Sequence, residues 1–118
     1  MSEVLNPVQI EAAIRNVADR ISRGVKVCSE RYEGFLTADR DYEQAFARAY
    51  LNADGPAHER KYTAELETAQ ERQQRDVADA AYRYADRTAK ALEAELRAYQ
   101  SVGASVRQMY AVSGRGEA

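Results

Sequence analysis

Apolar side chains recur every three or four residues through the first half of the chain, with one skipped step. This spacing places them along one face of an α-helix. Asn6 can cap the start of this helix, Pro7 suits its first position, and Gln9 can complete a capping box. We therefore predict one helix over residues 7–52, about 70 Å long. Its apolar stripe consists of Ile10, Ile14, Val17, Ile21, Val25, Cys28, Tyr32, Phe35, Tyr42, Phe46 and Ala49.

A turn interrupts the pattern at residues 53–56, where Gly55 can end one helix and Pro56 can begin the next. A second stripe follows, so we predict a helix over residues 57–111 and a flexible tail over residues 112–118. Some of its members lie eleven residues apart, which predicts a nearly straight or slightly right-handed helix pair. The stripe consists of Tyr62, Leu66, Ala69, Gln73, Val77, Ala80, Tyr84, Thr88, Leu92, Leu96, Tyr99, Val102, Val106 and Tyr110.

The short turn makes the two predicted helices antiparallel neighbours. The predicted fold is an all-α, coiled-coil-like hairpin that forms a single domain over residues 1–118. Further apolar residues, such as Ala78 and Ala89, lie beside the stripes and widen the apolar face beyond what two helices bury. We therefore predict that two copies associate into a four-helix bundle. The predicted partner interface consists of Tyr50, Leu51, Tyr82 and Ala85.

The composition limits the cellular locations and the classes of partner that we expect for this protein. The 118 residues are 45% hydrophobic and carry a net charge of −2, so no overall field favours nucleic acid or an anionic membrane. The single cysteine cannot form an internal disulfide, which fits a reducing cytoplasm. The first residues lack the basic and apolar segments of a secretion signal. Because no apolar run reaches the roughly 20 residues that span a bilayer, we expect a soluble, cytoplasmic protein without membrane contact.

The candidate catalytic and metal-binding residues do not combine into a site. His58 is the only histidine, and the sequence contains no Glu-x-x-His motif of the kind that holds metal pairs in helical bundles. Cys28 lies on the apolar stripe, where a cysteine behaves as a small core residue. Residues 113–116 lack the strand and the Lys-Ser/Thr ending of a phosphate-binding loop. We therefore predict no enzyme activity, no cofactor and no metal.

Charge is unevenly distributed along the chain. Residues 32–78 carry six basic and ten acidic residues, whereas the remaining residues carry eleven basic and nine acidic ones. In an antiparallel hairpin, basic residues of the first helix would face those of the second and could contact nucleic acid. The alternative is a solvent-exposed face of ion pairs with neighbouring Asp and Glu residues. The candidates for nucleic-acid contact are Arg15, Arg20, Arg23, Lys26, Arg83 and Arg87.

Two segments, YEQAFARAYL at residues 42–51 and LEAELRAYQSVGASVR at residues 92–107, flank a short turn and an Ala/Glu/Arg-rich helix. This arrangement, over residues 35–107, resembles small helical proteins of tailed bacteriophages, including phages of actinobacteria. Their genes often lie among DNA replication and recombination genes. The resemblance implies an accessory role in those processes and supplies no catalytic residues.

Three functions follow as hypotheses. The leading one is a non-enzymatic, self-associating adaptor or assembly protein, encoded by a phage, that binds itself and an unidentified protein partner. The second is an accessory factor in phage DNA replication or recombination that contacts nucleic acid or its protein machinery. The third is an inhibitor of a host protein, which would present a helical face or the acidic turn end of the hairpin.

Overall fold

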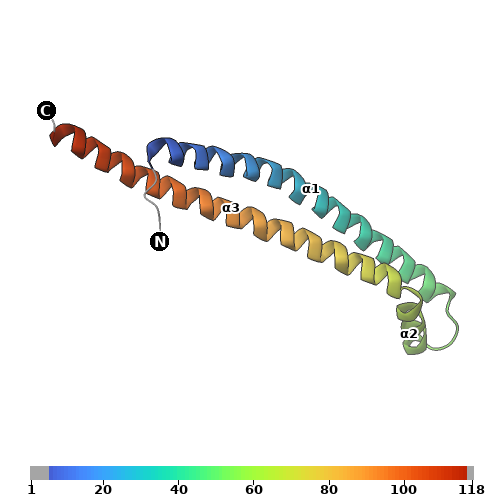
Figure 1. The fold of residues 1–118 in the computed structure, drawn as a ribbon. Helices are drawn as coiled ribbons and strands as arrows, with labels where there is room; N and C mark the ends of the chain where they lie inside the picture. Colours follow the sequence, from blue (N-terminus) through green and yellow to red (C-terminus); the bar gives the residue numbers. More distant parts are fainter. Residues whose placement is uncertain (1–5, 117–118) are drawn as a thin grey trace. The chain divides into compact units, whose positions relative to one another are not determined.

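The computed structural model describes residues 6–116 and the side chains of residues 6–113. Three helices occupy almost all of this range: α1 (Pro7–Asn52), α2 (Ala57–Glu67) and α3 (Ala69–Gly116), and the range contains no strand (Figure 1). The prediction of an all-α helical hairpin is confirmed, and the bounds of α1 agree with the predicted helix.

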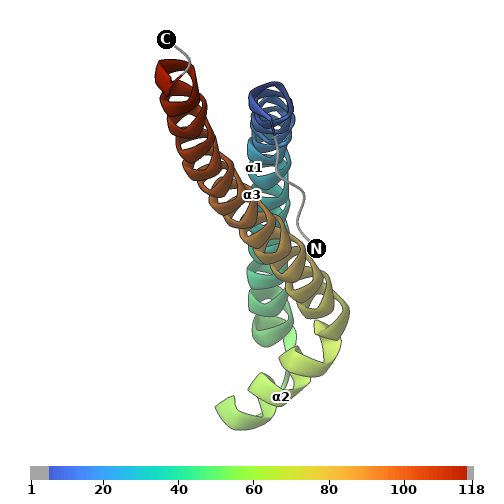
Figure 2. The ribbon, with the colours of Figure 1, turned by 60° about the vertical axis from the view of Figure 1, so that its left-hand side comes forward.

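Contacts between residues divide the chain into two compact units. Unit 1 comprises Met1–Lys26 and Arg87–Ala118, and unit 2 comprises Val27–Asp86. In each unit a stretch of α1 lies beside an antiparallel stretch of α3, and unit 2 also contains α2 (Figures 1 and 2). The predicted single domain over residues 1–118 stays a prediction.

The start of α1 is fixed by the predicted capping box. The Gln9 backbone N–H donates to Asn6 Oδ1 at 2.8 Å, and the Asn6 backbone N–H donates to Gln9 Oε1 at 3.0 Å. These reciprocal bonds satisfy backbone donors that the first turn of a helix leaves without intrahelical partners.

Gly55 makes the turn after α1 possible. Its φ of 95° lies in the left-handed region, and a methyl group there would lie 2.8 Å from Glu59 Oε2. Pro56 then caps the start of α2 with an extended backbone. Glycine adopts such a φ without the steric cost that other residues have.

The prediction of one continuous helix over residues 57–111 is wrong. Thr68, with φ −109° and ψ 17°, separates α2 from α3, and its Oγ1 donates to the Ala64 carbonyl oxygen at 2.6 Å. A threonine hydroxyl bound to the carbonyl four residues earlier often bends a helix.

At the C-terminal end, α3 continues to Gly116, so the predicted flexible tail is wrong for residues 112–116. Glycine weakens a helix by about 1 kcal/mol but does not break its hydrogen bonds. Residues 117–118 of the tail lie outside the described range.

The residues of α3 that face α1 follow a seven-residue repeat. The inner seam comprises buried or half-buried positions that alternate in steps of three and four, as in a coiled coil. The predicted eleven-residue pattern is therefore wrong as a description of the seam, because Leu66, Val77 and Tyr110 are 80%, 63% and 58% exposed. The inner seam consists of Glu71, Arg75, Ala78, Tyr82 and Ala85 in unit 2 and Ala89, Leu92, Leu96, Tyr99, Gly103 and Val106 in unit 1.

Small residues in the seam explain why the seam does not follow the large apolar residues of the predicted pattern. In unit 1, a methyl group at Gly103 would lie 3.2 Å from Ile10 Cγ2, and one at Gly24 would lie 3.9 Å from Leu92 Cδ1. Alanine and glycine thus allow the two backbones to approach closely. Gly24 faces α3, whereas the neighbouring Val25 is 63% exposed, contrary to its predicted place in the stripe.

Most of the predicted stripe of α1 does contact α3 or α2. Ile10, Val17 and Ala49 are between 1% and 9% exposed. Tyr32, which is 45% exposed, lies at the edge of the seam. The half-buried members are Ile14, Ile21, Cys28, Phe35, Tyr42 and Phe46.

Candidate functional site

Two of the four residues predicted to bind a partner lie in the inner seam of unit 2. Ala85 is only 7% exposed. Tyr82 is half-buried, and its ring centroid lies 5.1 Å from that of Tyr32 at a tilt of 52°. The prediction of partial exposure is wrong for Ala85, whereas Tyr82 keeps part of its surface exposed. Both occupy positions of the seven-residue repeat that faces α1.

The other two predicted interface residues, Tyr50 and Leu51, differ in how exposed they are. Tyr50 is half-buried, and its ring stacks on Phe46 with 6.4 Å between centroids. Phe46 in turn lies 6.1 Å from Tyr42. Leu51 is 75% exposed. Of the four predicted residues, only Leu51 therefore has most of its surface available to a partner.

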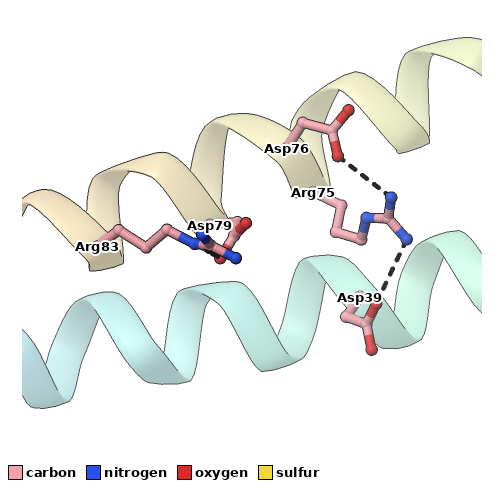
Figure 3. Close-up of polar contacts among 5 residues, drawn as sticks. All are labelled: Asp39, Arg75, Asp76, Asp79 and Arg83. Carbon is pink, nitrogen blue, oxygen red and sulfur yellow. Dashed lines mark hydrogen bonds and ion pairs between the residues drawn. The ribbon is translucent and has the colours of Figure 1, made fainter.

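A polar cluster in unit 2 joins α1 to α3 around Arg75. Its guanidinium lies over the Tyr42 ring, 4.7 Å from the ring centroid. It also forms ion pairs with Asp39 at 3.8 Å and with Asp76 at 3.2 Å (Figure 3). The Arg75 side chain is 29% exposed. Cation–π contact and ion pairs together hold this arginine in the seam, so it is a structural residue rather than a free cation.

The basic residues predicted to contact nucleic acid are only partly available. Arg83 binds Asp79 at 3.1 Å in unit 2 (Figure 3). In unit 1, Arg15 lies 3.9 Å from Glu11 and Arg20 lies 3.6 Å from Glu95. Within the part of the chain whose side chains are described, no ion pair involves Arg23, Lys26 or Arg87, which are exposed and belong to unit 1.

A second row of residues on α3, here called the outer stripe, has the same spacing as the inner seam and lies beside it. It meets α1 at two places: the Ala81 carbonyl oxygen accepts a hydrogen bond from Arg31 at 3.3 Å, and Glu95 pairs with Arg20. Eleven of its thirteen members are exposed, and Ala81 and Glu95 are half-buried. Glu95 is its only charged residue. The outer stripe consists of Gln70, Gln74, Val77, Ala81, Tyr84, Thr88, Ala91, Glu95, Ala98, Val102, Ser105, Met109 and Val112.

The larger side chains of the outer stripe expose much of their apolar surface. Val77 is 63% exposed, Tyr84 68%, Val102 44%, Met109 62% and Val112 60%. Polar members such as Thr88 and Ser105 interrupt the row, but eight apolar residues on one line are more than the singly scattered apolar residues that are normal on a protein surface. Val77, Tyr84 and Val102 belong to the stripe that residue spacing predicts for the core, but they are exposed.

A shallow hollow lies on this stripe in each unit. Gln74, Val77, Ala78 and Ala81 line the hollow in unit 2 together with Gln73. Ser105, Gln108, Met109 and Val112 line the hollow in unit 1 together with Ser113. In both, four lining residues stand at positions i, i+3, i+4 and i+7, the arrangement that accepts one side chain of a neighbouring helix in coiled coils.

The described residues offer little for other chemistry. Within residues 6–113, no three His, Cys, Asp or Glu side chains lie close enough to hold a metal ion. His58 is exposed and Cys28 is half-buried. None of the helices in the described part of the chain is both long and apolar enough to cross a membrane.

Comparisons with family models, with curated proteins and with solved structures give no match to this chain.

Proposed function

We propose that this chain is a non-enzymatic helical protein that associates with itself through the outer stripe of α3 and acts as an adaptor or assembly module. The observation that supports this proposal is the outer stripe itself, which is mostly exposed, carries a single charged residue and has eight apolar residues among its thirteen members. Its spacing matches that of the inner seam, where helices already pack against each other. The single cysteine fits a cytoplasmic location for such a module.

The energetics favour a helix as the binding partner. Burial of a valine or methionine side chain stabilises a complex by about 1.5–3 kcal/mol. The side chains of Val77, Val102 and Met109 are roughly half exposed, so each would contribute about 1 kcal/mol on contact with a partner. Several such contacts are needed to exceed the entropic cost of association, and a helix alongside α3 would supply them together.

The decisive experiment introduces a charge into the outer stripe. Val77→Glu places a carboxylate in the proposed interface, where burial of an unpaired charge is costly. Val25→Glu is a matched control, because both valines are 63% exposed and lie inside helices, but Val25 is outside the stripe. In light scattering, the wild type and Val25→Glu should have masses above the 13.2 kDa monomer, and Val77→Glu should have the monomer mass.

Two results would contradict the proposal. A wild-type mass of 13.2 kDa at micromolar concentration would exclude self-association. An oligomer that both charge variants retain would exclude the outer stripe as its interface.

A second candidate function is that of an accessory factor that contacts nucleic acid during phage DNA replication or recombination. It is favoured by Arg23, Lys26 and Arg87, which are exposed and form no ion pair within residues 6–113. Affinity for DNA should then fall steeply with added salt, and replacement of all three residues by glutamate should abolish it. Arg15→Glu, at a residue already paired with Glu11, should have the smaller effect in a fluorescence anisotropy titration. DNA binding by the triple variant would rule out this surface.

A further inference from the structure

We propose that Asp54 is a site of covalent modification, where its side chain and the Gly55 backbone nitrogen close into a succinimide ring that water then opens to isoaspartate. Both residues lie in the turn between α1 and α2, inside unit 2 (Figure 1). This inference goes beyond the proposed function, because it concerns the turn and uses no residue of the outer stripe.

The reaction needs no co-reactant other than water. The Gly55 nitrogen forms a bond to Cγ of the protonated Asp54 side chain, and the proton of the N–H leaves with the carboxyl hydroxyl as water. Water then adds to one of the two carbonyl carbons that flank the ring nitrogen. Opening at the original backbone carbonyl leaves the chain linked through the side chain, which is isoaspartate, and opening at the other carbonyl restores aspartate.

The nitrogen of Gly55 is free to make this attack. Gly55 is exposed, and it has no side chain that could shield its own nitrogen. Within residues 6–113, its N–H donates no hydrogen bond, whereas the nearby N–H groups of Ala53 and Glu59 donate to the carbonyl oxygens of Ala49 and Pro56 at 3.0 and 3.1 Å. The Gly55 nitrogen therefore reacts without the loss of a hydrogen bond within this range.

The carboxyl group of Asp54 is equally unrestrained. Asp54 is exposed and lies outside the helices. Among the residues whose side chains are described, it has no partner in a hydrogen bond or an ion pair. Its side chain can therefore rotate towards the backbone nitrogen of the next residue, as ring closure requires.

Helical structure protects the other aspartates of the chain. In an α-helix, the N–H of the residue after an aspartate points along the helix axis towards a carbonyl group of the preceding turn. Each of these aspartates is also followed by a residue that has a side chain, which hinders the approach of the carboxyl group. The aspartates inside α1 and α3 are Asp19, Asp39, Asp41, Asp76, Asp79 and Asp86.

The three asparagines, which can form the same ring with loss of ammonia, are protected in different ways. Asn52 is the last residue of α1, and the N–H that follows it is bonded to the Ala49 carbonyl oxygen. Asn6 precedes Pro7, which has no N–H. Asn16 lies inside α1. The structure thus singles out Asp54 among all aspartates and asparagines of the chain.

The modification changes the link between α1 and α2. Isoaspartate adds one atom to the backbone path, because the chain then runs through Cβ and Cγ of Asp54. Only residues 53–56 separate the two helices, and the Pro56 carbonyl oxygen accepts from the backbone N–H groups of Glu59 and Arg60 at 3.1 and 3.0 Å. The start of α2 is therefore the part of unit 2 that the longer link affects.

Peptide mapping of the full chain after prolonged incubation at neutral pH tests this site. Trypsin cleavage after Arg48 and Arg60 releases residues 49–60, in which Asp54 is the only aspartate. In the wild type this peptide should acquire the largest isoaspartate fraction of all, detected as a second chromatographic peak of unchanged mass that an isoaspartyl methyltransferase methylates. Isoaspartate formed from Asn52 would instead change the mass.

Two variants show whether the signal comes from Asp54. Asp54→Glu should abolish the second peak, because closure would then need a larger ring that forms more slowly. Asp41→Glu is the matched control, because Asp41 is also exposed but lies inside α1, and it should give the wild-type yield. Val77→Glu should also react like the wild type, so failure of self-association leaves this inference intact.

Two results would overturn the inference. The first is a folded wild type that forms no isoaspartate in residues 49–60, and formation in urea would then show that the turn holds Asp54 unreactive. The second is an equal isoaspartate yield at the helical aspartates of the folded chain, which would show that the turn does not select the site.

Discussion

At the residue scale, glycines in this chain have different roles that their surroundings define. Gly55 has a φ of 95°, and a methyl group there would displace the end of the flexible Glu59 side chain. Gly34 lies inside α1, is exposed, and has no atom within 4 Å of where a methyl group would lie. The first is required by the turn after α1, whereas the second only weakens a helix.

Alanine at Gly34 and alanine at Gly55 should therefore change the free energy of unfolding in opposite directions. Gly34→Ala should raise the free energy of unfolding by about 1 kcal/mol, because alanine favours the helix and restricts the unfolded chain. Gly55→Ala should lower it by about 1–2 kcal/mol, because alanine is strained at positive φ. Urea unfolding followed by circular dichroism measures both changes, and equal effects of the two variants would contradict this assignment.

At the element scale, α3 uses one seven-residue repeat for two faces. The inner seam packs on α1 in each unit, and the outer stripe is exposed. The side of the helix opposite the outer stripe is strongly charged, with Arg72, Asp79, Asp86, Glu93 and Arg107 at intervals of seven residues or multiples of seven. The charge distribution thus separates the exposed apolar face from the solvated face.

In unit 2, Tyr82 lies in the inner seam and Tyr62 lies on the surface, so their substitutions can be compared. Tyr82 packs on Tyr32, whereas Tyr62 of α2 is 63% exposed. Tyr82→Ala should cost about 2 kcal/mol of stability, since it removes a half-buried ring and an aromatic pair, and Tyr62→Ala should cost less than half as much. Both variants are to be compared in the Val77→Glu background, so that assembly does not contribute. Equal losses in urea unfolding would place Tyr82 outside the seam.

Much of α1 could be predicted from the sequence, whereas the face of α3 that packs on α1 could not. Asn6, Pro7 and Gln9 determine the start of α1 through local hydrogen bonds, and Gly55 with Pro56 determines the turn. On α3, large apolar residues indicate a core, but the seam uses alanine and glycine because the backbones approach closely. At the break, the Thr68 hydroxyl donates to the Ala64 carbonyl oxygen within an otherwise helical sequence, which residue spacing does not reveal.

At the scale of the whole molecule, the two proposed interactions use different residues. Self-association would bury the outer stripe, in which Glu95 is the only charged residue and already has Arg20 as its counter-ion. The charged side of α3 would stay in solvent after dimerisation, as would Arg23 and Lys26 of α1. A dimer could thus bind a second partner without competition, as an adaptor requires.

The repeat of α3 also limits which substitutions the helix can accept. In every seven residues, two positions face α1 and two belong to the outer stripe. Only three of seven positions are then free to vary in charge, compared with five of seven for a helix that has a single packing face. Most amino-acid changes along α3 would thus affect either the hairpin or its association, and sequence divergence in this helix should concentrate in the remaining three positions.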